Sequence, residues 1–275
     1  KTEASTYYGD MQNQKLLGHI PGLLWTAFAV APSPPAPNLP SALVVGWGTG
    51  MTARSLARYP LSVKVFELNP EVLETSRFFL PFDAPLVPER SPQIRIGDAR
   101  LLMEKEASNS AVLITSDPFN PWTAGGGSLY TREYLRNCRR VLSPGGIMAL
   151  WIPLYQMPLA STQMILATFY ETFPESEIWA ADQDFILTGR NTSLDSQPRP
   201  MRPLPPDALQ DLGAVGYASQ EELLEARVLP LQALENDFKT SRLNSDWRPN
   251  LEFETGRALA LETEAENLDW LASRL

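Results

Sequence analysis

One stretch of ten residues, Ser41-Ala-Leu-Val-Val-Gly-Trp-Gly-Thr-Gly50, constrains the fold of this chain more than any other. Four apolar residues lead into three alternating glycines, and a helical pattern follows from Met51 to Tyr59. This order predicts a strand, a tight turn and the start of a helix. Glycines let a ligand approach the backbone closely, and the first turn of a helix offers unpaired N–H groups. The stretch therefore predicts a nucleotide-binding turn.

A carboxylate follows at the end of the next predicted strand, which runs from Ser62 to Leu68. That residue is Glu67, and a carboxylate in this place can accept hydrogen bonds from both hydroxyls of a ribose. The glycine turn and the acidic strand end together predict a nucleoside site. Taken alone, they are also consistent with NAD as the ligand.

Strand and helix patterns alternate from Ala42 to Leu154, which predicts βαβ units and a parallel sheet. A helical pattern over Leu159–Phe173 and two further strand patterns, Glu177–Ala180 and Asp184–Thr188, follow. The last two predict a hairpin that gives the sheet an antiparallel edge. The predicted fold class is α/β, with a Rossmann-like, mostly parallel sheet, a short N-terminal segment and C-terminal helices. The expected strands of the alternating part are 42–45, 63–68, 94–96, 112–115 and 147–151, and the expected helices are 52–58, 71–79, 101–105 and 131–142.

Proline-rich stretches divide the chain into four parts. Residues 1–40 form an N-terminal segment that is predicted to be helical from Lys15 to Ala29 and ends in a connector with five prolines between 32 and 40. Residues 41–190 form the ligand-binding domain, and 191–206 form a second proline-rich loop. Residues 207–275 are predicted to be a helical extension that packs on the same domain. Its expected helices are 207–212, 223–228, 231–243 and 256–271.

The composition excludes several classes of function. The net charge of −9 and the isoelectric point near 4.8 argue against a nucleic-acid partner, which needs a basic face, and favour a cationic small molecule. Cys138 is the one cysteine and His19 the one histidine, so the sequence predicts neither a disulfide framework nor a metal site. Both residues fit buried structural roles best. The sequence shows no membrane-spanning run and no signal peptide.

Two aspartates follow predicted strands at the edge of the sheet where open α/β folds bind ligands. Asp98 can accept a hydrogen bond from the exocyclic amine of adenine, or cap the helix that begins at Ala99, or do both. Asp117, in Ser116-Asp-Pro118, is the first candidate for an active-site carboxylate. The alternative for Asp117 is a turn-starting residue before proline.

Three further features are candidates for the same site. The loop from Phe119 to Ser128 is rich in glycine and suits a mobile cover, although a passive connection is equally compatible with it. Within it, Trp122 offers either a flat face for a cation or plain packing. Gln14 belongs to a polar stretch that can hold an amino-acid group or lie exposed. Tyr155 reaches the carboxyl edge after the fifth predicted strand.

Taken with the glycine turn and Glu67, several motifs resemble the spermidine/spermine synthase family. These motifs are Gly97-Asp98, Ser116-Asp-Pro118, Leu129-Tyr-Thr-Arg-Glu-Tyr134 and Leu142-Ser-Pro-Gly-Gly146. The resemblance covers about residues 12–190 and implies the class I methyltransferase-like Rossmann fold. It also implies an S-adenosyl ligand, either S-adenosylmethionine or its decarboxylated form, used as a substrate.

Three segments look like one bacterial branch of that family, in which such a domain follows a multi-helix, transporter-like membrane region. They are Asp117-Pro-Phe-Asn-Pro-Trp-Thr-Ala-Gly125, Trp151-Ile-Pro-Leu-Tyr155 and Asn244-Ser-Asp-Trp-Arg-Pro249. The resemblance implies a domain at the cytoplasmic face of a membrane, attached to an N-terminal membrane region. A chain that begins at Lys1 is consistent with this expectation. We also expect a homo-oligomer.

The family resemblance implies a role for each site residue. Glu67 would hold the ribose hydroxyls and Asp98 the adenine amine, with Leu68 and Ala99 beside the nucleoside. The nucleoside wall would be formed by Gly46, Gly48 and Gly50. Gln14 would lie near the aminopropyl or methionine end of the ligand. Asp117 would face the substrate amine, with Tyr155 as the second catalytic candidate.

The chain departs from the family at three places. Thr49 stands where the synthases carry an aspartate that binds the donor's amine, and Ile114 stands where they carry the catalytic base. The family's Tyr-Pro-Ser-Gly segment is missing between Trp179 and Leu187. Aminopropyl transfer to a polyamine is the predicted reaction, because the resemblance favours it.

A lyase is the alternative, since it would convert S-adenosylmethionine to methylthioadenosine and homoserine lactone without any base. Methyl transfer and a non-catalytic nucleoside sensor of a membrane protein also stay open.

Overall fold

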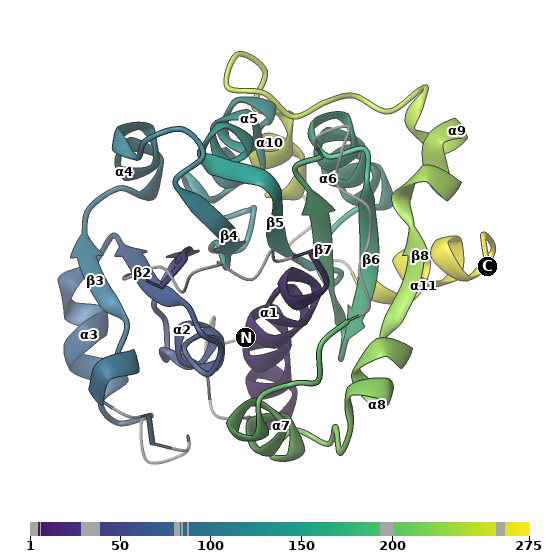
Figure 1. Ribbon diagram of the computed structural model, residues 1–275. Helices are drawn as coiled ribbons and strands as arrows, with labels where there is room; N and C mark the ends of the chain where they lie inside the picture. The colour runs from purple at the N-terminus through teal and green to yellow at the C-terminus, as the bar shows by residue number, and fades with distance from the viewer. Residues whose placement is uncertain are drawn as a thin grey trace.

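A single mixed sheet organises the part of the chain that the structure describes, and Figure 1 shows it crossing the molecule from β3 to β8. The structure is a computed structural model that describes residues 5, 7–28, 39–79, 83, 85–86, 88–192, 201–256 and 262–275. In these residues the sheet has eight strands in the order β3-β2-β1-β4-β5-β7-β6-β8. The strand order reverses direction beside β1, and such a switch point opens a crevice at the carboxyl ends of the strands.

Five strands are parallel and three form an antiparallel edge. β7 runs antiparallel between β5 and β6, and β8 pairs with β6. The strands are β1 (Ser41–Val45), β2 (Ser62–Glu67), β3 (Gln93–Ile96), β4 (Ala111–Ser116), β5 (Leu142–Pro153), β6 (Ser176–Ala181), β7 (Asp184–Arg190) and β8 (Arg227–Pro230). The predicted α/β class, with a mostly parallel sheet and an antiparallel edge, is confirmed.

Helices cover both faces of the sheet, and each face has its own hydrophobic cluster. One face carries α1 (Tyr8–Phe28), α2 (Met51–Leu56), α7 (Pro206–Gly213) and α8 (Gln220–Glu225). The other face carries α4 (Ala99–Lys105), α5 (Arg132–Val141), α6 (Leu159–Thr172), α10 (Asn250–Thr255) and α11 (Glu264–Ala272). The remaining helices are α3 (Pro70–Ser76), α9 (Glu235–Phe238) and the 3₁₀ turns η2 (Pro88–Arg90), η3 (Gly126–Tyr130) and η4 (Leu231–Leu234). Strands covered on both faces are nearly all apolar, as β1 and β4 are.

The first helix begins earlier than the hydrophobic pattern predicts. The pattern favours a helix from Lys15, whereas α1 begins at Tyr8. Its first turns carry polar side chains, yet Asn13, Gln14 and Lys15 are all buried. A helix that buries polar residues shows no hydrophobic periodicity there, and this is why the sequence misplaces its start.

The C-terminal part is less helical than predicted. The sequence predicts helices over 223–228 and 231–243, but the structure places strand β8 at Arg227–Pro230 and only short turns of helix after it. Leu229 pairs with Ile178 of β6, so the open edge of the sheet supplies hydrogen bonds that no local pattern reveals. The structure adds the unpredicted α10, and α11 begins at Glu264.

The predicted domain limits stay predictions. Of the proline-rich connector, residues 32–38 lie outside the described residues, as do residues 193–200 of the loop 191–206. None of the helices in the described ranges combines the length and apolar character needed to cross a membrane.

A buried ionic cluster joins α1 and α2 to α7. Lys15 Nζ lies 2.7 Å from Asp83 Oδ1 and also bonds Asp211, while Arg58 Nε lies 3.1 Å from Asp211 Oδ2. His19 Nε2 is 2.9 Å from Asp211 Oδ2, and burial keeps the pKa of His19 below its usual value. Burial would raise the pKa of Asp211, but the hydrogen bonds and charges of His19 and Lys15 outweigh this and lower it. His19 is thus a structural histidine, as predicted.

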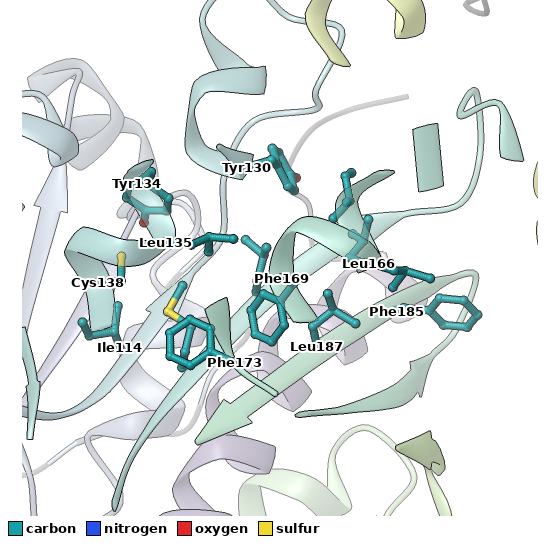
Figure 2. Packing of buried hydrophobic residues seen from close by; sticks show 14 of the residues in the cluster. Ile114, Tyr130, Tyr134, Leu135, Cys138, Leu166, Phe169, Phe173, Phe185 and Leu187 are labelled. Atoms are coloured by element: carbon teal, nitrogen blue, oxygen red, sulfur yellow. The ribbon is translucent and has the colours of Figure 1, made fainter. Parts of the chain in front are cut away.

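The core between β4 and helices α5 and α6 contains two residues that sequence analysis singled out. Figure 2 shows Ile114 and Cys138 packed among aromatic side chains that include Phe169 and Phe173. Burial raises the pKa of the Cys138 thiol to about 12, so it stays protonated and unreactive. Ile114 is fully buried in the middle of β4.

Candidate functional site

A cavity of about 440 Å³ opens at the carboxyl edge of the parallel strands. Its size lies within the ~300–1,000 Å³ typical of small-molecule sites. Its wall is built by α1, by the ends of β1, β2 and β4, by the loop after β4, and by Asp184 at the start of β7. The cavity therefore lies at the switch point that the strand order creates.

Most of the predicted site residues come together in this cavity. Those that line it are Gln14, Gly46, Gly48, Glu67, Leu68, Asp98, Ala99, Asp117 and Tyr155. Gly50 is not among the lining residues and instead caps α2. Its φ of +86° is in the left-handed region, and a Cβ there would lie 2.6 Å from the Trp47 ring. Gly50 therefore shapes the glycine turn but is not part of the cavity wall.

Gly46 is required by a close approach between two strands. Its φ is +91°, and a Cβ on it would lie 2.8 Å from the Asp117 carbonyl oxygen. The Asp117 N–H in turn donates to the Val45 carbonyl. This contact brings the glycine turn and the loop after β4 against each other, so Asp117 lies directly beside the turn.

Glu67 is held rigidly at the end of β2. Its Oε2 accepts from the Trp47 N–H at 2.8 Å, and its Oε1 accepts from the Asn69 N–H at 2.8 Å. The side chain is only 4% exposed. Two backbone donors fix the orientation of this carboxylate beside the glycine turn, where the hydroxyls of a ribose can donate to it.

Asp98 performs the structural role that the sequence left open and also lines the cavity. Its Oδ1 accepts from the Arg100 N–H at 2.8 Å, which caps α4. Leu68 and Ala99 lie at the same end of the cavity, and Leu68 is largely exposed. This capping hydrogen bond holds the Asp98 carboxyl group at the cavity, where it can also accept a hydrogen bond from the amine of a ligand.

Asp117 is the carboxylate closest in sequence to the end of β4. Burial raises its pKa to about 6, and a hydrogen bond of 3.3 Å from Thr52 Oγ1 opposes this only in part. A carboxyl group of this kind changes its protonation near neutral pH. It can take up a proton at the pH of a working enzyme, as a general base must.

Tyr155 and the loop after β4 form one side of the cavity. The Tyr155 hydroxyl donates to Asn120 Oδ1 at 3.0 Å, and its ring meets the Trp122 ring edge-on at 5.6 Å. Trp122 packs against Tyr155 and does not line the cavity, whereas Gly125 and Gly126 do. Of the two roles considered for Trp122, the structure favours packing.

α1 supplies the opposite side. The Thr49 hydroxyl donates to Gln14 Oε1, and Gln14 Nε2 donates to the Asp10 carbonyl at 2.9 Å. Gln14 and Asp10 line the cavity, whereas Thr49, which belongs to the glycine turn, is buried and does not line it. The residue that departs from the family pattern at position 49 therefore orients Gln14.

Asn13 belongs to the polar N-terminal stretch that the sequence offered for an amino-acid group, and it lines the cavity with two residues that were not predicted as site residues, Trp151 and Asp184. Asp184 Oδ2 accepts from Asn13 Nδ2 at 2.6 Å and from Trp151 Nε1 at 3.1 Å. Asp184 is 2% exposed and opens a strand whose next residues are Phe, Ile and Leu. A charged residue that opens an apolar strand at the carboxyl edge was the signal available in the sequence.

The cavity wall is strongly acidic. Carboxylates of Asp10, Glu67, Asp98, Asp117 and Asp184 line it. Among the described lining residues the cation is Arg100, and its Nη1 is 2.9 Å from Asp246 Oδ1 and 2.6 Å from the Ser128 carbonyl. The described residues contain no group of three or more His, Cys, Asp or Glu side chains arranged to hold a metal ion. The wall suits a ligand with positive charge.

The strand order, in which the antiparallel β7 lies between β5 and β6, is that of the class I methyltransferase-like group of Rossmann folds. The glycine turn after β1 and the acidic residue at the end of β2 agree with it. Residues 11–180 match the family model described as the spermine/spermidine synthase domain. The chain therefore belongs to the spermine/spermidine synthase family.

Individual relatives agree with this assignment. A polyamine aminopropyltransferase of Nitrosomonas europaea is 37% identical over 144 residues, which are 48% of this chain and 41% of that protein. A spermidine synthase crystallised with the transition-state analogue AdoDATO has a TM-score of 0.56 at 18% identity, covering 82% of this chain and 75% of that one. A probable spermidine synthase from Corynebacterium glutamicum has a TM-score of 0.54 at 22% identity, covering 83% and 80%.

The curated relative is matched over less than half of its own length. At these identities the two solved structures show that the fold is shared.

Proposed function

We propose that this domain transfers the aminopropyl group of decarboxylated S-adenosylmethionine to an amine of a polyamine. The observation that carries the proposal is Asp117, a carboxylate with a pKa of about 6 that lies in the cavity beside the glycine turn. Family membership and the acidic wall support the same reaction.

The nucleoside of the donor would occupy the end of the cavity formed by Glu67, Asp98 and the glycine turn. Glu67 would accept from the ribose hydroxyls, and Asp98 from the adenine amine. Gly46 and Gly48 would let the nucleoside approach the backbone closely. The sulfonium and the aminopropyl chain would then extend towards Asp117 and Gln14.

The charge of the wall favours the decarboxylated donor over intact S-adenosylmethionine. A carboxylate on the donor would face Asp10, Asp117 and Asp184, while Arg100 is already bound by Asp246. Like charges at close range in a poorly solvated site repel strongly. The same argument counts against the lyase, whose nucleophile is that donor carboxylate.

In the proposed step the acceptor ammonium first loses a proton to Asp117, because only a neutral nitrogen has a lone pair to donate. The lone pair forms a C–N bond to the aminopropyl carbon attached to sulfur. The C–S bond breaks, and its electron pair goes to sulfur, which leaves as the neutral thioether methylthioadenosine. Loss of such a base typically costs about 10²–10⁴-fold in rate.

Asp117 would carry the role of the family's base at a shifted position. Ile114, which occupies the base's place in the motif, is buried in the core and cannot accept a proton. Asp117 follows β4 directly and reaches the cavity. The departure at Ile114 is therefore compatible with a base-catalysed reaction.

Product analysis by mass spectrometry tests the proposal. The protein is incubated with S-adenosylmethionine or its decarboxylated form, each with and without putrescine. We expect spermidine and methylthioadenosine only when decarboxylated donor and putrescine are both present. Asp117→Asn should bind methylthioadenosine normally but lose this activity.

Other products identify the alternatives. Homoserine lactone from S-adenosylmethionine alone would show the lyase, and a methylated amine would show methyl transfer. Donor binding without any product would show a nucleoside sensor. Unchanged turnover by Asp117→Asn would remove Asp117 from the mechanism.

The expected context of the domain also stays a prediction. The attached membrane region, the cytoplasmic face and the homo-oligomer follow from the family resemblance alone. Each can be tested on the full-length protein by fractionation and by its mass in solution.

A further inference from the structure

The end of the cavity farthest from the nucleoside contains a carboxylate that the step above does not use. Asp184 begins β7, whereas Glu67 ends β2. The strand order β2-β1-β4-β5-β7 places three strands between the two. The lining carboxylates Glu67, Asp117 and Asp184 therefore follow one another across the edge of the sheet, in chain order.

Asp184 is oriented by donors from two other elements. Asn13 Nδ2 of α1 and Trp151 Nε1 of β5 both donate to its Oδ2, at 2.6 and 3.1 Å. All three residues line the cavity. Both donors are neutral groups, and together they fix the orientation of the Asp184 carboxyl group at the cavity wall.

Asn13 is a second sign of a ligand at this end. Its side chain is 6% exposed, and its Oδ1 has no hydrogen-bond partner among the described residues. A buried acceptor without a donor costs about 1–3 kcal/mol. An ammonium group, which carries only donors, is the kind of ligand group that matches both Asn13 Oδ1 and the Asp184 carboxylate.

The spacing of the two carboxylates fits a ligand with two ammonium groups. β4, which leads into Asp117, and β7, which begins at Asp184, are separated by β5 alone. Two strand spacings correspond to about 10 Å. A short aliphatic diamine can span this distance with one nitrogen near each carboxylate.

We propose that Asp184, positioned by Asn13 and Trp151, binds the ammonium group at the non-reacting end of a diamine acceptor. This inference rests on the proposed function, in which Asp117 serves the reacting nitrogen. It makes Asp184 the residue that distinguishes a diamine from a monoamine. The indole of Trp151 and the phenol of Tyr155 also line the cavity and would contact the methylene chain.

Calorimetry on the protein saturated with methylthioadenosine tests this assignment without requiring turnover. Putrescine and butylamine, which differ by one amino group, are titrated into the wild type and into Asp184→Asn. We expect Asp184→Asn to weaken putrescine binding by about 10- to 100-fold, the usual range for a charged hydrogen bond. Butylamine and methylthioadenosine should bind both proteins equally.

Asp182→Asn is the matched control, because it makes the same charge change in the exposed turn between β6 and β7. It should leave putrescine binding unchanged. Trp151→Phe keeps the Asp184 charge but removes one orienting donor, and should weaken putrescine binding a few-fold. This second variant keeps the proposal testable if Asp184→Asn does not fold.

Three results would overturn the assignment: equal putrescine affinity in wild type and Asp184→Asn, an equal loss for putrescine and butylamine, or no putrescine binding by the wild type at millimolar concentration. A weaker affinity for methylthioadenosine alone would place Asp184 on the donor and also contradict it. Diamine binding that depends on Asp184, without aminopropyl transfer, would retain this inference and refute the proposed reaction.

Discussion

At the scale of single residues, burial gives Asp117 a pKa that suits the proposed reaction, but the ionised carboxylate destabilises the folded protein. The protein gains no stability from a carboxylate that burial makes harder to ionise. Buried groups of this kind are common in active sites, where the pKa of a group has to match its task. The loss of stability can be measured by comparing the wild type with Asp117→Asn, which is uncharged and has nearly the same shape.

We expect Asp117→Asn to be more stable than the wild type at pH 8 and equally stable at pH 4. The folded pKa of about 6 lies above the unfolded value of 3.8, so the folded state binds the proton more tightly. The stability that this gives is present below pH 3.8 and is lost as the pH rises through 6. One pKa unit is worth about 1.4 kcal/mol, and cavity water screens part of the charge, so we expect about 2 kcal/mol.

Urea unfolding of both proteins between pH 4 and pH 8 measures this difference. If the difference in the free energy of unfolding between the two proteins does not change with pH, Asp117 ionises normally in the folded protein.

Glu67→Gln should weaken methylthioadenosine binding by about 10- to 100-fold, because an amide can accept from only one of the two backbone donors and loses the charge that strengthens hydrogen bonds to ribose. Calorimetry measures the effect. Glu71→Gln, in the exposed first turn of α3, is the matched control and should bind like the wild type. Normal affinity in Glu67→Gln would place the nucleoside elsewhere.

The residues of the nucleoside end were predictable because they lie within local motifs. A glycine turn, a strand-ending acid and a helix cap each reveal themselves in a few consecutive residues. The pairing of Asn13 with Asp184 was not predictable in this way, since 171 positions separate the two residues and only the folded chain brings them together. Gly50 was predicted to form part of the nucleoside wall, but it shapes the turn and does not line the cavity.

At the scale of elements, the loop after β4 is tethered from the C-terminal part of the chain. Asn244 is fully buried, and its Nδ2 donates to the Gly127 carbonyl at 3.0 Å. The Arg132 N–H donates to the Asn244 carbonyl at 3.0 Å, and the Gly125 N–H donates to Glu252 Oε1 at 3.3 Å. This loop is one wall of the cavity, so a segment far along the chain helps to shape the site.

Asn244→Ala should lower the free energy of unfolding by about 2 kcal/mol, because it leaves the buried Gly127 carbonyl without its donor. It should also make the loop 119–130 more sensitive to proteases. Chemical denaturation and limited proteolysis followed by mass spectrometry measure the two effects. The exposed Asn236→Ala serves as the control, and equal cleavage of both variants would show that the tether does not hold the loop.

The elements themselves show where the hydrophobic pattern succeeds. It places the strands from β1 to β7, and its signal is most continuous in β1 and β4, which are nearly all apolar because both of their faces are buried. It misses the start of α1, where the buried side chains are polar, and it misses β8, which depends on pairing with β6. Both failures have one physical origin: the partners are distant in sequence.

At the scale of the whole molecule, the buried ionic cluster holds α1 against the domain. α1 brings Asn13 and Gln14 to the cavity, while its next residue, Lys15, bonds Asp83 and Asp211 on the other side. The ion pairs of Lys15 therefore help to fix the part of α1 that lines the cavity.

Asp211→Asn should destabilise the protein by about 3–5 kcal/mol, because Lys15 and Arg58 would lose a buried counter-charge. The pKa of Asp211 is lowered in the folded state, so its contribution is present above the unfolded pKa and is lost as the pH falls below about 4. The difference in stability between the wild type and Asp211→Asn should therefore become smaller in acid. Thermal unfolding at pH 7 and pH 3 tests this. The control is Asp207→Asn of α7, which removes a half-exposed carboxylate whose ion pair with Arg90 lies near the surface. A gap that stays the same at pH 3 would contradict the assignment.

The acidic wall has a further consequence for the catalytic cycle of the proposed reaction. The donor enters with a positive sulfur, but the methylthioadenosine that remains is neutral at that atom. The carboxylates that attract the positively charged donor therefore attract neutral methylthioadenosine only weakly. Product release and donor capture would be driven by the same fixed charges, so the cavity would favour replacement of product by fresh donor without moving any element of the fold.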